Sequence, residues 1–216
     1  MQEEYLVLAN GKKISYVAEP QYEATMMQKV EPALAALRTE TEMPVSGGTL
    51  HAENYILPDA KEAVIVVHGF TESAEKMREM VWYFVQAGYS VFSYDMRGHG
   101  RSLRLVEDLN VIHVEDFQDY VNDLEEFILK VVRPAVGKMP LQLFAHSCGG
   151  AVGAHFLVRH PDTFRRAVLT SPMIAPSAAP FPLWVGKLMA GFMCLIGKKK
   201  QMAFVGSPFD GDKLTL

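Results

Sequence analysis

The sequence has no excess of charge of either sign and very little cysteine. Its 216 residues include 21 basic and 25 acidic side chains, which gives a net charge of -4. A protein that binds nucleic acid needs basic residues to face the phosphates, so no nucleic-acid partner is expected. The two cysteines, Cys148 and Cys194, lie far apart without ligand-like spacing. They predict reduced thiols in a cytoplasmic protein rather than a disulfide or a metal site.

The sequence also lacks an uninterrupted apolar run long enough to span a membrane. Residues 1–4 are acidic, and no positively charged segment followed by an apolar run indicates a signal peptide. Residues 181–197 come nearest to a span, but Lys187 near their middle opposes insertion by roughly 2.5–3.5 kcal/mol. We therefore expect a lid helix or lipid-facing flap there, with contact to a membrane surface through residues 181–197. The expected location is the cytoplasm, peripheral to the membrane.

Residues 1–46 precede the informative part of the chain. Two β-prone runs flank Asn10-Gly11, a pair that favours a tight hairpin turn. A polar helix is expected across residues 22–37. Residues 49–57 then alternate apolar and polar side chains, as an antiparallel strand with one buried face does. The first segment is therefore expected to be a hairpin and a helix ahead of the main domain.

From residue 63 onward, strand-like runs alternate with amphipathic stretches. Residues 63–67 are a continuous apolar run, as a strand buried on both faces requires, and residues 90–94 are expected to be a second buried strand. Further strands are expected at 141–145 and 167–171. The amphipathic stretches predict one helix that ends before Gly88 and others at 116–131 and 148–159. Such alternation indicates βαβ units, and therefore a mostly parallel sheet with helices on both faces.

Ser147 lies where this fold would expose a nucleophile. It falls between the expected strand at 141–145 and the helix at 148–159. A nucleophile elbow needs this context, because a strained strand-to-helix turn lifts the serine clear of the sheet. So tight a bend also needs small neighbours, and Ala145 and Gly149 meet that requirement. The sequence predicts Ser147 as the nucleophile, with an ordinary serine on a tight turn as the alternative.

A second segment predicts the partner groups of an oxyanion hole. His68-Gly69-Phe70 directly follows the first buried strand, where a loop can supply one amide to a developing oxyanion. We expect the backbone N–H groups of Phe70 and Cys148 to be the two donors. His68 and His99 are expected to stabilise loops through hydrogen bonds rather than to act as bases.

Four segments together resemble the bacterial lysophospholipase and monoacylglycerol lipase group of α/β-hydrolases, which is often classed with the serine aminopeptidases. They are VHGF at 67–70, DMRGHGRS at 95–102, AHSCGG at 145–150 and SPM at 171–173. The resemblance covers roughly residues 47 to 216. It implies the α/β-hydrolase fold and ester hydrolysis through an acyl-enzyme, without a metal or organic cofactor. Cys148 departs from the methionine usual in the group, but only its backbone amide is functional there.

The resemblance also implies a division of the chain and a class of substrate. Residues 47–175 would form the hydrolase core, and residues 176–216 would begin a cap over the acyl-binding cleft. The substrate would be a monoacyl lipid or another ester. The soft and aromatic side chains expected to line the cleft are Met173, Phe181, Trp184, Met189 and Phe192. Plain core packing is the alternative for the stretch at 189–193.

The residues needed to activate Ser147 are missing from the sequence. A serine nucleophile needs a base oriented by an acid, and in this fold the acid and then the histidine follow the serine. The later histidines are His155, about 12 Å along the expected helix, and His160, just after it. Neither would reach the serine hydroxyl. We expect the chain to stop within the cap, without the last two strands, which leaves an exposed sheet edge at 167–171.

Three functions are consistent with these patterns. The first is a serine ester hydrolase acting on monoacyl lipids. The second is a proline-type serine aminopeptidase, which would need an acidic pocket for the substrate amine that the sequence does not show. The third is a non-catalytic binding protein, if 216 residues is the true length.

Overall fold

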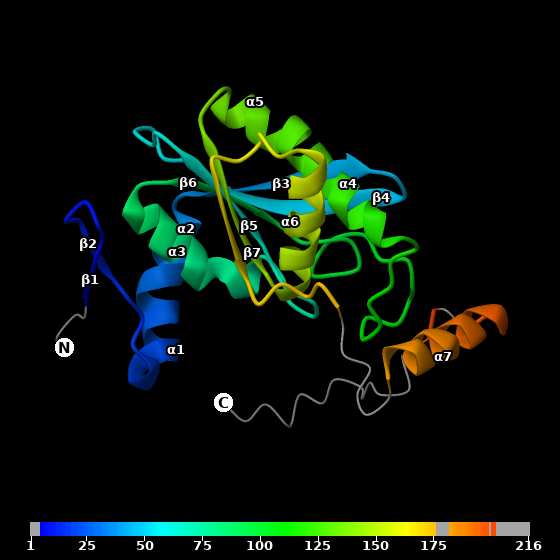
Figure 1. Cartoon of the computed structure of the whole chain (residues 1–216). Helices are drawn as coiled ribbons and strands as arrows, with labels where there is room; N and C mark the ends of the chain where they lie inside the picture. The colour runs from blue at the N-terminus through cyan, green and yellow to red at the C-terminus, as the bar shows by residue number, and fades with distance from the viewer. Residues whose placement is uncertain (1–4, 176–181, 199, 202–216) are drawn as a thin grey trace.

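A six-stranded sheet forms the centre of the molecule, with helices on both of its faces (Figure 1). The computed structural model describes residues 5–175, 182–198 and 200–201. The strand order is β3-β4-β6-β5-β7-β8. The strands are β3 (Arg38–Val45), β4 (Gly48–Tyr55), β5 (Ala63–Val67), β6 (Ser90–Tyr94), β7 (Leu141–His146) and β8 (Arg166–Thr170). The last four in chain order are parallel, whereas β4 runs antiparallel to β3 and β6. The expected mostly parallel sheet is confirmed.

The helices follow the predicted positions closely. On one face lie α1 (Tyr22–Thr25), α2 (Glu31–Ala35) and α3 (Arg78–Ala87); on the other lie α4 (Phe117–Phe127), α5 (Arg133–Val136) and α6 (Ser147–Arg159) (Figure 1). Asp116 caps α4 by accepting the Gln118 amide at 2.8 Å, and Gly88 ends α3 in a left-handed conformation. A π-helical segment, Ile128–Val132, joins α4 to α5.

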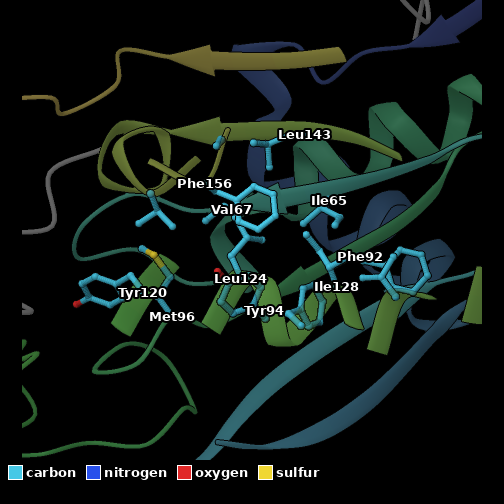
Figure 2. Close-up of a cluster of buried hydrophobic side chains, with 14 of the residues drawn as sticks. Ile65, Val67, Phe92, Tyr94, Met96, Tyr120, Leu124, Ile128, Leu143 and Phe156 are labelled. Atoms are coloured by element: carbon cyan, nitrogen blue, oxygen red, sulfur yellow. The ribbon is translucent and has the colours of Figure 1, made fainter. Parts of the chain in front are cut away.

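The sheet has one hydrophobic core on each of its two faces, and the central strand β5 contributes side chains to both. In β5, Ile65 and Val67 belong to one buried cluster, and Val64 and Val66 belong to the other. The first cluster, drawn in Figure 2, packs the sheet against α4 and α6. The second packs it against α2 and α3. This two-sided burial is the physical reason for the continuous apolar run at Ala63–Val67.

The N-terminal region is partly as expected. The hairpin is confirmed, with β1 (Tyr5–Val7) antiparallel to β2 (Lys13–Ser15), and helical turns cover residues 22–35. Strand β3, which begins at Arg38 almost directly after these turns, was not predicted from the sequence. Met43 is the only buried residue of β3. Because β3 is an edge strand with mostly polar side chains, its sequence has no apolar pattern that would predict a strand.

The last described helix lies away from the sheet. Helix α7 (Leu183–Leu195) has no buried residue, and Figure 1 shows it apart from the other helices. Among the described residues, no helix combines the length and the apolar character that crossing a bilayer requires. Strand β8, as expected, forms one edge of the sheet, where Val168 is 54% exposed.

Candidate active site

Three strained turns lie at the carboxyl ends of neighbouring parallel strands. Thr71, Ser147 and Ser171 have φ angles of 62°, 49° and 46°. They follow β5, β7 and β8, which are adjacent in the sheet. Residues other than glycine avoid this conformation, and such strained positions gather at functional sites. Ligands of open α/β sheets bind outside this same edge, so the turns indicate where a site would lie.

Ser147 lies at the turn from β7 into α6, with the surrounding backbone packed closely. A Cβ atom on Gly149 would lie 2.4 Å from the carbonyl oxygen of His68 and 2.8 Å from that of Val67. One on Gly150 would lie 2.9 Å from the Cα atom of Pro172. The start of α6 therefore lies directly against the loop after β5, and Ser147 lies at the junction of β7 and α6. The helix begins at Ser147, one residue earlier than predicted.

Two backbone amides near Ser147 have no hydrogen-bond acceptor among the described residues. These are the amides of Phe70 and Cys148. Cys148 is the second residue of α6, and the first four N–H groups of a helix have no partner within it. The loop that carries Phe70 comes close to the serine, because a Cβ atom on Gly69 would lie 3.1 Å from that of Ser147. The loop and the helix start thus bring both amides near the serine.

His68 holds this loop as a neutral ring. Its Nε2 atom accepts a hydrogen bond from the Met96 amide at 2.9 Å, so Nδ1 carries the proton that it donates to the Gly69 carbonyl at 2.7 Å. Burial lowers the pKa of His68. Burial and the neighbouring His68 also lower the pKa of His99 to about 4, and the Nδ1 atom of His99 lies 3.0 Å from the Arg97 carbonyl. The prediction that both histidines stabilise loops is confirmed.

Asp95 fixes the glycine-rich loop after β6. Its carboxylate accepts hydrogen bonds from the amides of Ala74 at 2.7 Å and Arg101 at 2.8 Å. Gly100 lies so near that a Cβ atom there would be 2.1 Å from the same carboxylate. Asp95 therefore joins the loop after β6 to the one after β5.

The three histidines nearest to Ser147 in the sequence have partners elsewhere. The Nδ1 atom of His146 lies 3.0 Å from the Thr170 hydroxyl, and His155 packs edge-on against Phe117. His160 lies 3.3 Å from the carboxylate of Glu125. None of the seven histidines, all of which are described, makes a hydrogen bond to the Ser147 hydroxyl.

The residues expected to line the acyl cleft are not gathered in one place. Met173 packs against the core, and its amide donates to the Ser147 carbonyl at 2.8 Å. Trp184, Met189 and Phe192 are on α7, where they are 64%, 41% and 61% exposed. Phe181 lies outside the described residues. Of the five, only Met173 is brought next to the serine by a contact in the described structure.

A cleft that no sequence motif predicts lies beside these loops, lined mainly by polar residue types. Its volume is about 600 Å³, and the loops after β5 and β6 form its walls. Glu72 lines it and accepts the Gly69 amide at 2.7 Å. Burial would raise the pKa of Glu72, but the Gly69 amide and Lys76 bring it below its usual value. Lys76 and Arg104 also line the cleft. Lys76 and Arg104 belong to no recognisable motif. Only their positions shortly after the VHGF and DMRGHGRS segments could have indicated that they line a site.

One group of side chains has the composition of a metal site but is occupied by cations of the protein itself. The ligand-type atoms of Glu40, His51 and Glu53 lie within 4.8 Å of one another. Arg78 binds Glu53 at 2.5 Å, and Arg101 lies 3.1 Å from both Glu53 and Glu40. These guanidinium groups neutralise the carboxylates, so the group is an ion-pair network that is buried at Glu53 and Arg78 and exposed at Glu40 and Arg101.

Solved structures with the same fold are hydrolases. A soluble variant of monoglyceride lipase from Saccharomyces cerevisiae matches with a TM-score of 0.62 and 19% identity, over 76% of this chain and 54% of the other. A carboxyl esterase from Bacillus coagulans matches with a TM-score of 0.61 and 20% identity, over 77% and 53%. At this level of identity, the likeness shows the fold alone.

Sequence relatives narrow the family. Lysophospholipase L2 of Escherichia coli (strain K12) is 39% identical over 110 residues, which cover 51% of this chain and 32% of the relative. A monoacylglycerol lipase of Mycolicibacterium smegmatis is 25% identical over 166 residues, or 73% and 57%. The chain thus spans about a third to somewhat more than half of the relatives' length. The resemblance to the lysophospholipase and monoacylglycerol lipase group is confirmed.

The model of the family described as serine aminopeptidase, S33, matches residues 58–212, more than half of the chain. The chain therefore belongs to the serine aminopeptidase S33 family of α/β-hydrolases.

Proposed function

We propose that this protein is a serine ester hydrolase that acts on monoacyl lipids through Ser147. The observation that carries the proposal is the strained Ser147 turn beside two backbone amides without a described acceptor. The named relatives, a lysophospholipase and a monoacylglycerol lipase, support the class of substrate.

The proposed reaction begins with attack of the Ser147 Oγ atom on the ester carbonyl carbon. The amides of Phe70 and Cys148 donate hydrogen bonds to the oxyanion, and the positive end of α6 stabilises the same charge. The tetrahedral intermediate collapses with loss of the alcohol, and water then hydrolyses the acyl-enzyme to release the fatty acid. The proton of Ser147 must pass to a base, which gives it to the leaving alcohol and then takes a proton from the attacking water and returns it to Ser147. Since no histidine of the chain bonds to Ser147, we propose that the base and its acid are not among the described residues.

A substitution pair tests the nucleophile. In a form of the protein that carries the base, Ser147→Ala should reduce hydrolysis of a short-chain p-nitrophenyl ester by several orders of magnitude, because it removes the attacking oxygen. Ser171→Ala is the matched control, since Ser171 has a similar φ of 46° at the end of the next strand. It should retain most of the parent rate. If Ser147→Ala hydrolyses the ester as fast as the parent, the assignment is wrong.

A covalent probe separates the nucleophile from its activation. A fluorophosphonate should label Ser147 where a base is present, and fail to label the Ser147→Ala variant. Labelling of a longer form of the protein but not of the 216-residue chain would support a base outside these residues. Absence of labelling in both would favour the non-catalytic binding function.

The aminopeptidase function has one observation in its favour, the description of the matching family. An aminopeptidase needs a free carboxylate to bind the substrate amine. In the described cleft the carboxylate of Glu72 is already paired with Lys76 at 3.0 Å. Turnover of a monoacylglycerol compared with that of a proline amide distinguishes the two functions. Faster turnover of the amide would overturn the lipid assignment.

A further inference from the structure

The cleft between the loops after β5 and β6 has the position of a subsite for the alcohol part of a substrate. Its wall begins at Thr71, directly after Phe70, whose amide is a proposed oxyanion donor. His99 lines the same cleft, with its ring 5.7 Å from that of Phe70. Ser147 does not line it. A group bound there would therefore lie beside the reacting ester rather than on it.

The charges in the cleft leave one cation unpaired. The two oxygens of Glu72 are occupied, one by the Gly69 amide and the other by Lys76. This pairing neutralises both Glu72 and Lys76. Arg104 also lines the cleft, and no carboxylate of the described residues lies within ion-pair distance of it. The cleft thus carries the charge of one guanidinium group.

Arg104 is held in place while most of its donors remain available. The preceding residue, Leu103, donates its amide to the Thr49 carbonyl at 2.9 Å and accepts the Gly98 amide at 2.8 Å. The Nη1 atom of Arg104 donates to the Leu109 carbonyl at 3.0 Å. Its Nε and Nη2 atoms donate to no described residue. A guanidinium fixed at one nitrogen, with other N–H groups unused, is suited to binding two oxygens of one phosphate.

We propose that this cleft binds the phosphate of a lysophospholipid head group, with Arg104 as the residue that selects phosphorylated over neutral monoacyl lipids. This inference rests on the proposed function. The phosphate of a lysophospholipid is joined to the ester through glycerol, so the substrate would extend from Ser147 past Phe70 into the cleft. Lys76 would assist, since it lines the same cleft and its side chain is 66% exposed.

Equilibrium binding tests the proposal without turnover. The protein would carry Ser147→Ala, and calorimetry would measure binding of sn-glycero-3-phosphocholine, glycerol and inorganic phosphate. Arg104→Gln should weaken binding of glycerophosphocholine by about tenfold or more, because a charged hydrogen-bond donor is lost. Arg104→Lys, which keeps the charge without the fork, should lose less. Binding of glycerol should be the same in all variants.

Arg133→Gln is the matched control. Arg133 also donates to main-chain carbonyls, those of Gly137 and Met139, but it does not line the cleft. It should bind glycerophosphocholine like the parent. Thermal unfolding would check that each variant is folded. If Arg104→Gln does not fold, the comparison of Arg104→Lys with the parent still tests the proposal.

Three results would overturn the inference. They are no binding of glycerophosphocholine by the parent, equal binding by Arg104→Gln, or binding of inorganic phosphate as tight as that of glycerophosphocholine. The last would indicate a site for free phosphate. Labelling of Ser147 by a fluorophosphonate does not involve Arg104, so it separates a failure of the subsite from a failure of the hydrolase function.

Discussion

Gly149 gives the most direct test of how the Ser147 turn is built. A Cβ atom there would lie 2.4 Å from the His68 carbonyl oxygen and 2.8 Å from that of Val67, where ordinary contacts begin at 3.4 Å. Both obstacles are main-chain atoms that cannot rotate away. In Gly149→Ala, α6 and the loop after β5 must therefore separate by about 1 Å, the difference between these contact distances.

Two opposing effects set the size of the change. Alanine favours a helix over glycine by about 1 kcal/mol. Overpacking of a close contact costs about 1–3 kcal/mol, and rigid backbone atoms place this case at the upper end. We expect Gly149→Ala to lower the free energy of unfolding by about 1–2 kcal/mol, measured by urea titration followed by circular dichroism. Because the same shift separates Ser147 from Phe70, ester hydrolysis should fall by about 100-fold.

Gly153→Ala is the control in the same helix. Its Cβ atom would lie 2.9 Å from Cδ2 of Leu143 and 3.2 Å from Cδ2 of Leu169. These are ends of flexible side chains, so the gain in helix propensity should offset most of the cost. Stability within about 1 kcal/mol of the parent and a rate near that of the parent are expected. If Gly149→Ala were as stable and as active as Gly153→Ala, close backbone packing would not be what positions the serine.

Three further substitutions test the surrounding network. The lowered pKa of His99, about 4 against 6.5 in an unfolded chain, means that only the unfolded state binds this proton between those pH values. The free energy of unfolding should therefore fall by up to about 1.4 kcal/mol per pH unit as the pH drops through this window. The urea midpoint of His99→Gln should depend less on pH than that of the parent. Equal pH dependence of the two midpoints would contradict this. Asp123→Ala leaves the buried Arg97 without its 2.6 Å and 2.7 Å bonds but with Asp119 at 3.4 Å, so it should cost about 3 kcal/mol, the lower end of the range for a broken buried pair. An additional Arg97→Met should restore much of the loss in the same titration. Gly100→Ala should weaken the loop anchored by Asp95, because the added Cβ atom would lie 2.1 Å from the Asp95 carboxylate. The expected result is a lower melting temperature, and an unchanged one would refute the anchoring role.

The sequence predicted the central strands more accurately than the edges, for a physical reason. The bounds of β5 match the prediction because this strand is buried on two faces, which requires the continuous apolar run at Ala63–Val67. The bounds of β6 match as well, and this strand is also buried along its length, although it includes Ser90 and Ser93. The edge strand β3 needs few apolar residues and gives no such pattern. Ser147 was predictable because a tight turn restricts its neighbours to small residues.

The cleft residues were harder to predict because their roles depend on pairing across loops. Whether Glu72 or Arg104 carries an unpaired charge depends on contacts with Gly69, Lys76 and Leu109, which belong to separate turns. The division into residues 1–46, 47–175 and 176–216 stays a prediction.

The two halves of the proposed site differ in how firmly they are held. Strands β5 and β7 lie side by side within the sheet, each with a second neighbour, and carry the Phe70 loop and the Ser147 turn. Such strands are the last to open, because their hydrogen bonds are protected on both sides. In contrast, α7 is exposed and β8 pairs on one side only among the described residues. A preorganised oxyanion site loses its effect when its donors move, whereas a surface that receives a flexible acyl chain tolerates movement. The Phe70 loop and the Ser147 turn, which would require accurate geometry, thus lie on the strands expected to be the most stable, whereas the expected acyl-lining residues of α7 lie on an exposed helix.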